Sequence, residues 1–208
     1  MISKQQFVIS SNTLNEIFYK VLRELRDFDY DLYSHSLRVG YLSHRFAKYL
    51  DYNQDDLNKI FIGATLHDIG KIIIPKSILN STEKLTPIER DIIKLHPIYG
   101  YELLKLYCCD GDILRIVRDH HENINGSGYP YNALGVDISN FAMIVHIADV
   151  YDALINARSY KGPVEPVTVR YYLMANAGIQ FDAYLVNKFV EFIKEHEYSD
   201  RELILTVC

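Results

Sequence analysis

Cysteine is scarce in this sequence, and its arrangement excludes two common uses of the residue. The chain contains three cysteines, Cys108, Cys109 and Cys208, an odd number in which two are adjacent rather than spaced as C-x-x-C. A disulfide framework needs an even set of cysteines, and a thiolate zinc site needs spaced pairs of them. We therefore expect reduced thiols and a cytoplasmic protein.

Long apolar runs and a strong positive charge are also missing. No stretch approaches the ~18 consecutive apolar residues of a membrane span, and the opening MISKQQFVISSN lacks the apolar segment of a signal peptide. The formal net charge of -5 gives no broad cationic surface for a nucleic-acid polymer. We expect neither a membrane span nor a nucleic-acid polymer as partner, so an anionic ligand would have to be held by a local pocket.

Apolar residues recur with the period of an α-helix along most of the chain. Leu14, Ile17, Val21 and Leu25 mark one face of a first helix, and similar patterns predict a second at 39–50 and a third at 57–66 that ends near Gly70. Further helices are predicted from Thr86 to before Pro97, through 101–107, and at 112–121, 140–156, 165–176 and 184–195. Few segments alternate with period two, so the predicted fold class is all-α.

One helix start has a recognisable capping sequence. Thr86 supplies a capping hydroxyl, Pro87 suits the first helical position, and Glu89 stands where a reciprocal side chain completes a capping box. The residues Ile72, Ile73 and Ile74 before Pro75 form an apolar run that is too short to require a sheet.

Histidine and aspartate occur in contexts that suit a metal centre. The candidate ligands are His35 in YSHSLRV, His67 and Asp68 in LHDIGK, His96 in KLHP, the pair His120 and His121, and Asp149 in HIADVYDAL. Imidazoles mixed with carboxylates favour manganese, iron or zinc over magnesium or calcium, which prefer oxygen shells. Seven ligands are too many for one tetrahedral ion, but they suit two ions that share a bridging carboxylate such as Asp68.

A structural interpretation competes with each of these assignments. A single histidine is more often a core or surface residue than a ligand, and His44, His146 and His196 are left with that interpretation. Asp31 lies four residues before His35 and could either supply a third metal position or cap the helix start, where Asp29 competes with it. We favour the structural role for Asp31 slightly.

The motifs HSLRV, HDIGKIIIP, LHP, HHENINGSGYP and ADVYDAL, in this order, resemble the HD-GYP family of bacterial phosphodiesterases over roughly residues 29–190. The resemblance implies an all-α helical bundle of the HD superfamily with a metal centre in its core. It implies hydrolysis of cyclic di-GMP to linear pGpG, with pGpG and GMP as alternative final products, and two or three divalent ions of iron or manganese. Residues 29–208 would form the catalytic domain, and 1–28 an N-terminal helix that either leads in from another domain or belongs to the bundle.

The resemblance also implies roles for individual residues. The residues that match the family's metal ligands are His35, His67, Asp68, His96, His120, His121 and Asp149. Asp31 stands where members with three ions carry a longer glutamate, so it is the candidate ligand of a third ion. Asp68 and Lys71 match catalytic positions, and the residues that match substrate contacts are Lys71, Tyr129 of the GYP element, Arg158 and Lys161. Departures from the family pattern are Asn123, Asn125, Ser159 and Ala183.

Two alternatives remain open at this point. The chain could be an HD-type phosphohydrolase for another nucleotide or cyclic dinucleotide. It could instead be a cyclic di-GMP sensor or docking domain, with a diguanylate cyclase or a second copy of the chain as partner. Turnover of cyclic di-GMP distinguishes the enzyme from the sensor, and a substrate panel distinguishes the two enzymes.

Overall fold

The computed structural model describes residues 12–107, 110–156 and 164–204, and these residues are organised as helices with no strand beyond two isolated bridges. The predicted all-α class is confirmed. The α-helices are α1 (Asn12–Phe28), α2 (Tyr30–Tyr49), α3 (Gln54–Leu66), α4 (Lys76–Leu79), α5 (Pro87–Ile93), α6 (His96–Lys105), α7 (Gly111–Asp119), α8 (Asn140–Ile155), α9 (Pro166–Ala175) and α10 (Ala183–Ile204). Two short 3₁₀ helices are η1 (Ile69–Ile73) and η2 (Gly135–Asp137).

Several helices begin at a side chain that accepts hydrogen bonds from the free backbone N–H groups of the first turn. Asp29 caps α2 by accepting from the backbone nitrogen of Leu32 at 2.8 Å, which places the cap at Asp29 and leaves Asp31 in the first turn. The predicted capping box is confirmed: Thr86 accepts from the backbone of Glu89, and the Glu89 carboxylate accepts from the backbone of Thr86.

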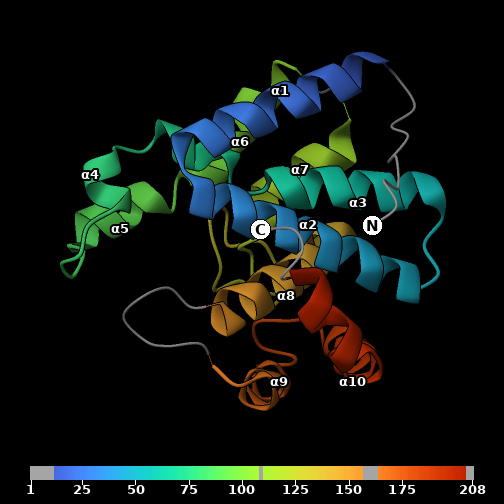
Figure 1. Ribbon diagram of the computed structural model, residues 1–208. Helices are drawn as coiled ribbons and strands as arrows, with labels where there is room; N and C mark the ends of the chain where they lie inside the picture. The colour runs from blue at the N-terminus through green and yellow to red at the C-terminus, as the bar shows by residue number, and fades with distance from the viewer. Residues whose placement is uncertain (1–11, 108–109, 157–163, 205–208) are drawn as a thin grey trace.

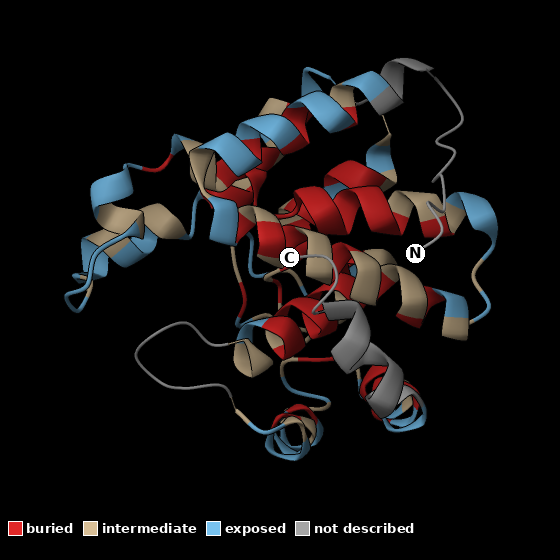
Figure 2. Ribbon diagram, viewed as in Figure 1, coloured by how far each residue is buried: buried red, intermediate tan, exposed pale blue. Residues whose placement is uncertain are grey.

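The core consists of two apolar clusters that meet along α2 and α3. One cluster joins these helices to α8, α9 and α10 through side chains such as Phe46, Ile147 and Phe189. The other joins them to α1, α6 and α7 through side chains such as Leu25 and Val117. Figure 2 shows the buried residues concentrated on α2, α3 and α8. Each fully buried side chain of this size contributes about 1.5–3 kcal/mol relative to exposure, so α2 and α3 form a rigid support for the residues they carry.

The first helix packs on the second of these clusters. Leu25 of α1 is fully buried and Phe18 is 5% exposed, and α1 contacts α2, from which it diverges to the right in Figure 1. The division between residues 1–28 and 29–208 stays a prediction. None of the helices in the described residues combines the length and apolar character that crossing a membrane requires.

Three predicted details differ in the structure. The third helix ends at Leu66, and Gly70 lies inside η1 rather than at a helix end. Helix α6 begins at His96, one residue before Pro97, because proline is tolerated in a first turn whose N–H groups are free. The four-residue helix α4 was not predicted, and with α5 it forms a projection with no buried residue on either helix (Figure 1).

Candidate metal centre

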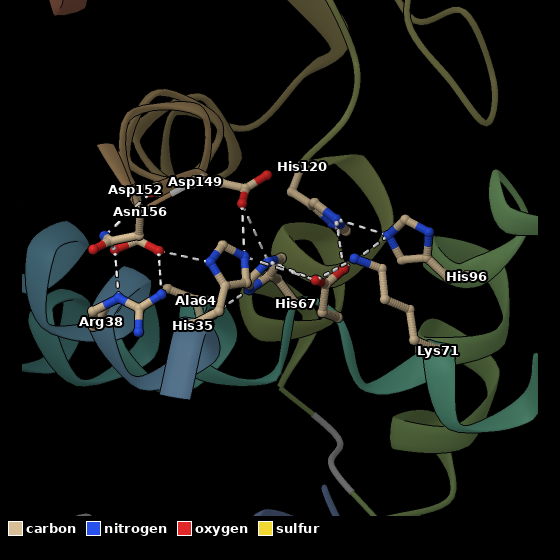
Figure 3. A network of polar contacts seen from close by, with 11 residues as sticks. His35, Arg38, Ala64, His67, Lys71, His96, His120, Asp149, Asp152 and Asn156 are labelled. Carbon is tan, nitrogen blue, oxygen red and sulfur yellow. Dashed lines mark hydrogen bonds and ion pairs between the residues drawn. The ribbon is translucent and has the colours of Figure 1, made fainter. Parts of the chain in front are cut away.

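The seven candidate ligands come from five helical regions and converge in the interior of the bundle. They are His35 in the second turn of α2, His67 and Asp68 between α3 and η1, His96 at the start of α6, His120 and His121 at the end of α7, and Asp149 in α8. Figure 3 shows His35, His67, His96, His120 and Asp149 directed towards one space. Helix ends place side chains from different helices in one cavity, which is the usual construction of a site in a bundle.

Three of the histidines are oriented by the same local device. The Nδ1 atoms of His67, His96 and His120 donate to the backbone carbonyl oxygens three residues earlier, at 2.6, 2.8 and 2.9 Å respectively. A carbonyl oxygen can only accept, so Nδ1 carries the proton in the neutral rings and Nε2 holds the lone pair. Each helix end therefore presents a ready acceptor or metal-binding atom to the shared space.

The first group of ligand atoms consists of Asp68, His96, His120 and His121, whose atoms all lie within 4.8 Å of one another. Nε2 of His96 lies 3.1 Å from Oδ1 of Asp68 and 3.2 Å from Nε2 of His120. In the neutral tautomers both Nε2 atoms are acceptors, and two acceptors cannot form a hydrogen bond. A cation between them would remove this repulsion.

The second group consists of His35, His67 and Asp68, and Asp149 borders it. Nε2 of His67 lies 3.4 Å from Oδ2 of Asp68 and 3.6 Å from Oδ1 of Asp149. Nε2 of His35 lies 3.0 Å from the same oxygen of Asp149. Two imidazoles and two carboxylates thus face one another at the second position, and the carboxylate of Asp68 belongs to both groups.

Two buried atoms at the centre lack a hydrogen-bond partner. Nε2 of His67 and Oδ1 of Asp68 are both buried without one, although Oδ1 of Asp68 has the His96 ring nearby. Unsatisfied buried polar atoms are costly and rare in folded proteins. Here they are one atom from each kind of side chain that binds divalent transition metals, so the residues present fit such ions.

Electrostatics pair a cationic histidine with two ionised carboxylates. Burial by itself lowers the pKa of His67, but the nearby negative charges of Asp68 and Asp149 outweigh burial and raise that pKa to about 10. Burial raises the pKa of Asp68, but Lys71 and His67 outweigh it and hold the pKa well below its usual range. The carboxylate of Asp68 is therefore ionised at neutral pH, as a bridging ligand must be.

The pKa values of the two histidines at the end of α7 are lowered, whereas that of His67 is raised. Burial, and after it the neighbouring histidines, lower the pKa values of His120 and His121 well below the usual value. Burial also lowers the pKa of His96, against the influence of Asp68. The first group therefore presents neutral imidazoles at pH 7, which is the form that binds metal ions.

Lys71 lies at the edge of the centre. Its Nζ atom donates to Oδ2 of Asp68 at 2.5 Å, and its side chain is 24% exposed. The lysine therefore contacts the shared carboxylate from the solvent side. A partly exposed cation in this position is available to an anionic ligand that approaches the centre.

The remaining predicted residues lie in different surroundings. Asp31 is exposed in the first turn of α2 and belongs to neither ligand group. The Tyr129 ring lies against that of His121, with centroids 4.7 Å apart. Arg158 and Lys161 lie outside the described residues, as does Ser159. His146 is buried beside Phe181 and Gln180, as the structural interpretation predicts.

Two residues that the sequence analysis did not single out orient a candidate ligand. Asp152 accepts from Nδ1 of His35 at 2.8 Å and is held by the guanidinium of Arg38 at 2.8 and 2.9 Å. A usable signal was present: Asp152 follows Asp149 by three residues on one helix, and Arg38 follows His35 by three on another. Both pairs therefore lie on common helix faces.

Asn125, one of the departures from the family pattern, forms hydrogen bonds within the loop between α7 and α8. The Asn125 side-chain oxygen accepts from the backbone nitrogen of Ser127 at 3.0 Å and from its hydroxyl at 2.7 Å. An aspartate at this position would accept in the same way, so asparagine preserves the turn. Gly126 adopts a φ of 76°, which residues with a Cβ rarely adopt.

A sequence profile described as HD domain matches residues 21–185 of the chain. The cyclic di-GMP phosphodiesterase response regulator RpfG of Xanthomonas campestris is 38% identical over 70% of this chain and 39% of its own length. The 3'3'-cGAMP-specific phosphodiesterase 2 of Vibrio cholerae is 34% identical over 88% of this chain and 35% of its own length. A cyclic di-GMP phosphodiesterase of Thermotoga maritima is 34% identical over 84% of this chain and 48% of its own length. The chain thus spans less than half the length of these relatives.

Solved structures share the fold. Bd1817 of Bdellovibrio bacteriovorus, described as a HDG"Y"P protein, superposes with a TM-score of 0.64 at 24% identity, over 77% of this chain and 51% of that one. The HD domain of the L. monocytogenes phosphodiesterase PgpH, in complex with cyclic-di-AMP, superposes with a TM-score of 0.66 at 20% identity. The superposition covers 84% of this chain and 93% of that one. At these identities the likeness concerns the fold alone.

Proposed function

Because the chain belongs to the HD domain family, we propose that it is a metal-dependent phosphodiesterase that hydrolyses cyclic di-GMP to linear pGpG and then to GMP. The observation that carries the proposal is the position of Asp68, whose carboxylate belongs to both groups of ligand atoms. Two metal positions that share a carboxylate suit the displacement of an alkoxide from a phosphodiester. The resemblance to the HD-GYP family in five separate motifs supports the same activity.

The proposed cofactors are two divalent ions, with iron or manganese as the metal. His96, His120 and His121 would hold one ion, and His35, His67 and Asp149 the other, with Asp68 between them. Mixed imidazole and carboxylate ligands suit both metals. A third ion at Asp31 stays a prediction.

The protein's own residues would bind the substrate and stabilise its charge. When bound, the ions supply Lewis acidity to the phosphodiester and to the attacking water. Lys71, which contacts Asp68 from the solvent side, would neutralise charge on the phosphate as the transition state forms. Arg158 and Lys161 would grip the phosphate, and Tyr129, whose ring lies on His121, would contact the substrate near the centre.

A second cyclic dinucleotide, with a different pair of bases, is a candidate substrate. Relatives of comparable identity are named for cyclic di-GMP and for 3'3'-cGAMP, and the two dinucleotides differ in one of their two bases. The ligand groups act on the phosphodiester, which both molecules contain. Hydrolysis of 3'3'-cGAMP is therefore the alternative activity.

The test uses one anaerobic preparation of the protein, because iron centres oxidise during ordinary handling. Bound metal is measured by elemental analysis, and the same sample is assayed with cyclic di-GMP, 3'3'-cGAMP, cyclic di-AMP and a cyclic mononucleotide. We expect two or more ions per chain and fastest turnover of cyclic di-GMP. Metal-loaded, folded protein that leaves every cyclic dinucleotide intact would remove the enzymatic proposal.

A non-catalytic sensor gives a different result in the same experiment. It would bind cyclic di-GMP tightly in several metal forms without cleaving it. A docking partner, such as a diguanylate cyclase or a second copy of the chain, stays a prediction.

A further inference from the structure

Glu122 follows the two α7 histidines directly and is 2% exposed. It belongs to neither group of ligand atoms. Its carboxylate instead accepts from the backbone nitrogen of Tyr131 at 2.6 Å and from that of Ala133 at 3.0 Å, one bond on each oxygen. A single side chain thus bonds to backbone groups nine and eleven residues further along the chain.

Tyr129 lies in the segment between Glu122 and the two backbone groups that Glu122 binds. On its near side, the Tyr129 backbone nitrogen donates to the carbonyl oxygen of His121 at 3.1 Å. Gly128 packs so closely there that a Cβ would overlap backbone atoms of His121, Glu122 and Asn123. After Tyr129, the backbone of Tyr131 and Ala133 donates to the Glu122 carboxylate. The chain is therefore hydrogen-bonded to residues 121–122 both at Tyr129 and after it.

The result of this arrangement is the placement of one aromatic ring. The Tyr129 ring lies 4.7 Å from that of His121 at an interplanar angle of 33°, and 6.3 Å from that of His96 at 76°. The ring therefore borders two histidines of the first ligand group. Because Tyr129 is partly exposed, packing alone constrains it less than it would a core residue, and the backbone anchors matter more.

We propose that Glu122 is a positioning residue, whose carboxylate holds the returning chain so that Tyr129 stays against His121 at the edge of the metal centre. The part of this inference that concerns substrate rests on the proposed phosphodiesterase function. Replacement of Glu122 by glutamine keeps the shape of the side chain but places an amide N–H opposite a backbone N–H, so one of the two bonds is lost. The turn then loosens on the side that follows Tyr129.

The placement of the ring is tested without any activity measurement. Zinc-loaded protein with labelled histidines gives an NMR signal for the His121 ring, assigned with His121→Gln, and a stacked tyrosine shifts that signal. We expect Glu122→Gln to move the His121 signal in the same direction as Tyr129→Leu. Glu89→Gln is the matched control, because Glu89 also accepts from the backbone but within the capping box of α5; it should leave the signal in place.

The role in the reaction is tested by steady-state kinetics with cyclic di-GMP. A contact that is made equally in the ground state and the transition state affects KM rather than kcat, so we expect Glu122→Gln to raise KM roughly five- to tenfold with kcat within about twofold. In a Tyr129→Leu background the same substitution should add little, since the two residues act through one contact.

The outcomes separate the two proposals. Folded Glu122→Gln protein with an unchanged His121 signal, or effects on KM that add fully to those of Tyr129→Leu, would overturn the positioning role. If Glu122→Gln does not fold, Glu122→Asp, which keeps the charge but shortens the reach, is subject to the same two criteria. Wild-type protein that shows the ring shift but does not cleave cyclic di-GMP would contradict the proposed function and leave the positioning of Tyr129 established.

Discussion

Nδ1 of His35 donates to Oδ2 of Asp152 at 2.8 Å, so a buried carboxylate fixes the ring of a candidate metal ligand. His67, His96 and His120 are oriented by backbone carbonyl oxygens instead. His35 is thus the member of these four whose orientation depends on a replaceable side chain. Such outer partners orient the ring and increase the basicity of the ligating nitrogen.

We predict that Asp152→Asn weakens metal binding at the second ligand group by about 10–100-fold. The amide keeps the volume of the side chain but removes the charge that both His35 and Arg38 contact. Metal titrations against a competing chelator measure the change. Asp137→Asn, at an exposed position in η2, is the control and should bind metal as the wild type does. Unchanged affinity in Asp152→Asn would mean that metal binding by His35 does not depend on the charge of Asp152.

Because Asp68 belongs to both ligand groups, its replacement should remove more metal than the replacement of a ligand that belongs to one group. Asp68→Asn removes a ligand from both groups, whereas His121→Ala removes one from the first group only. We therefore expect elemental analysis to find both ions depleted in Asp68→Asn and one retained in His121→Ala. Circular dichroism checks that both variants stay helical. Loss of a single ion from Asp68→Asn would show that its carboxylate does not bridge the two positions.

The helices were predictable because their signals are local. The apolar period of α1, the capping box at Thr86 and the histidine motifs are each contained in a short stretch of sequence. The seven candidate ligands could be named for the same reason, since each stands in a recognisable motif. Their convergence depends on tertiary packing, which no single motif specifies.

The residues that were missed act across long distances in sequence. Asp152 contacts His35 over 117 positions. The three-residue spacing from Asp149 places Asp152 on the same helix face, but it does not identify a partner on another helix. Gly70 was interpreted as a helix end, but its φ is not positive and it lies in η1. Its role is a close approach, since a Cβ there would overlap the carbonyl oxygen of His96 and the backbone nitrogen of Gly100.

This close approach predicts a large effect of Gly70→Ala. A methyl group would force η1 away from α6, whose first residue is the candidate ligand His96. We expect a loss of unfolding free energy of about 2–4 kcal/mol, together with weaker metal binding. Urea unfolding of the metal-free protein measures the first effect. Gly111→Ala is the control, because a Cβ there meets nothing within 4 Å, and it should change stability by less than about 1 kcal/mol. Equal effects of the two substitutions would contradict the packing argument.

The protonation of His67 predicts opposite behaviour of metal-free and metal-loaded protein at alkaline pH. Burial disfavours the imidazolium, but Asp68 and Asp149 raise the pKa of His67 to about 10, against an ordinary value of 6.5. Between these values the folded, metal-free chain binds a proton that the unfolded chain does not. The stability from this proton is complete below pH 6.5 and is lost as the pH rises through about 10, with a slope of at most about 1.4 kcal/mol per pH unit.

A bound metal ion removes this dependence, because a ligating His67 has already lost its proton. We therefore predict that the unfolding free energy of metal-free protein falls between pH 7 and pH 9, while that of metal-loaded protein does not fall with it. Urea titrations of both forms at several pH values measure the difference, in which the titration of residues remote from the centre cancels. The gap between the two curves should widen with pH. Parallel curves would mean that His67 carries no extra proton in the metal-free protein, and that the two carboxylates beside it do not act on it as their distances imply.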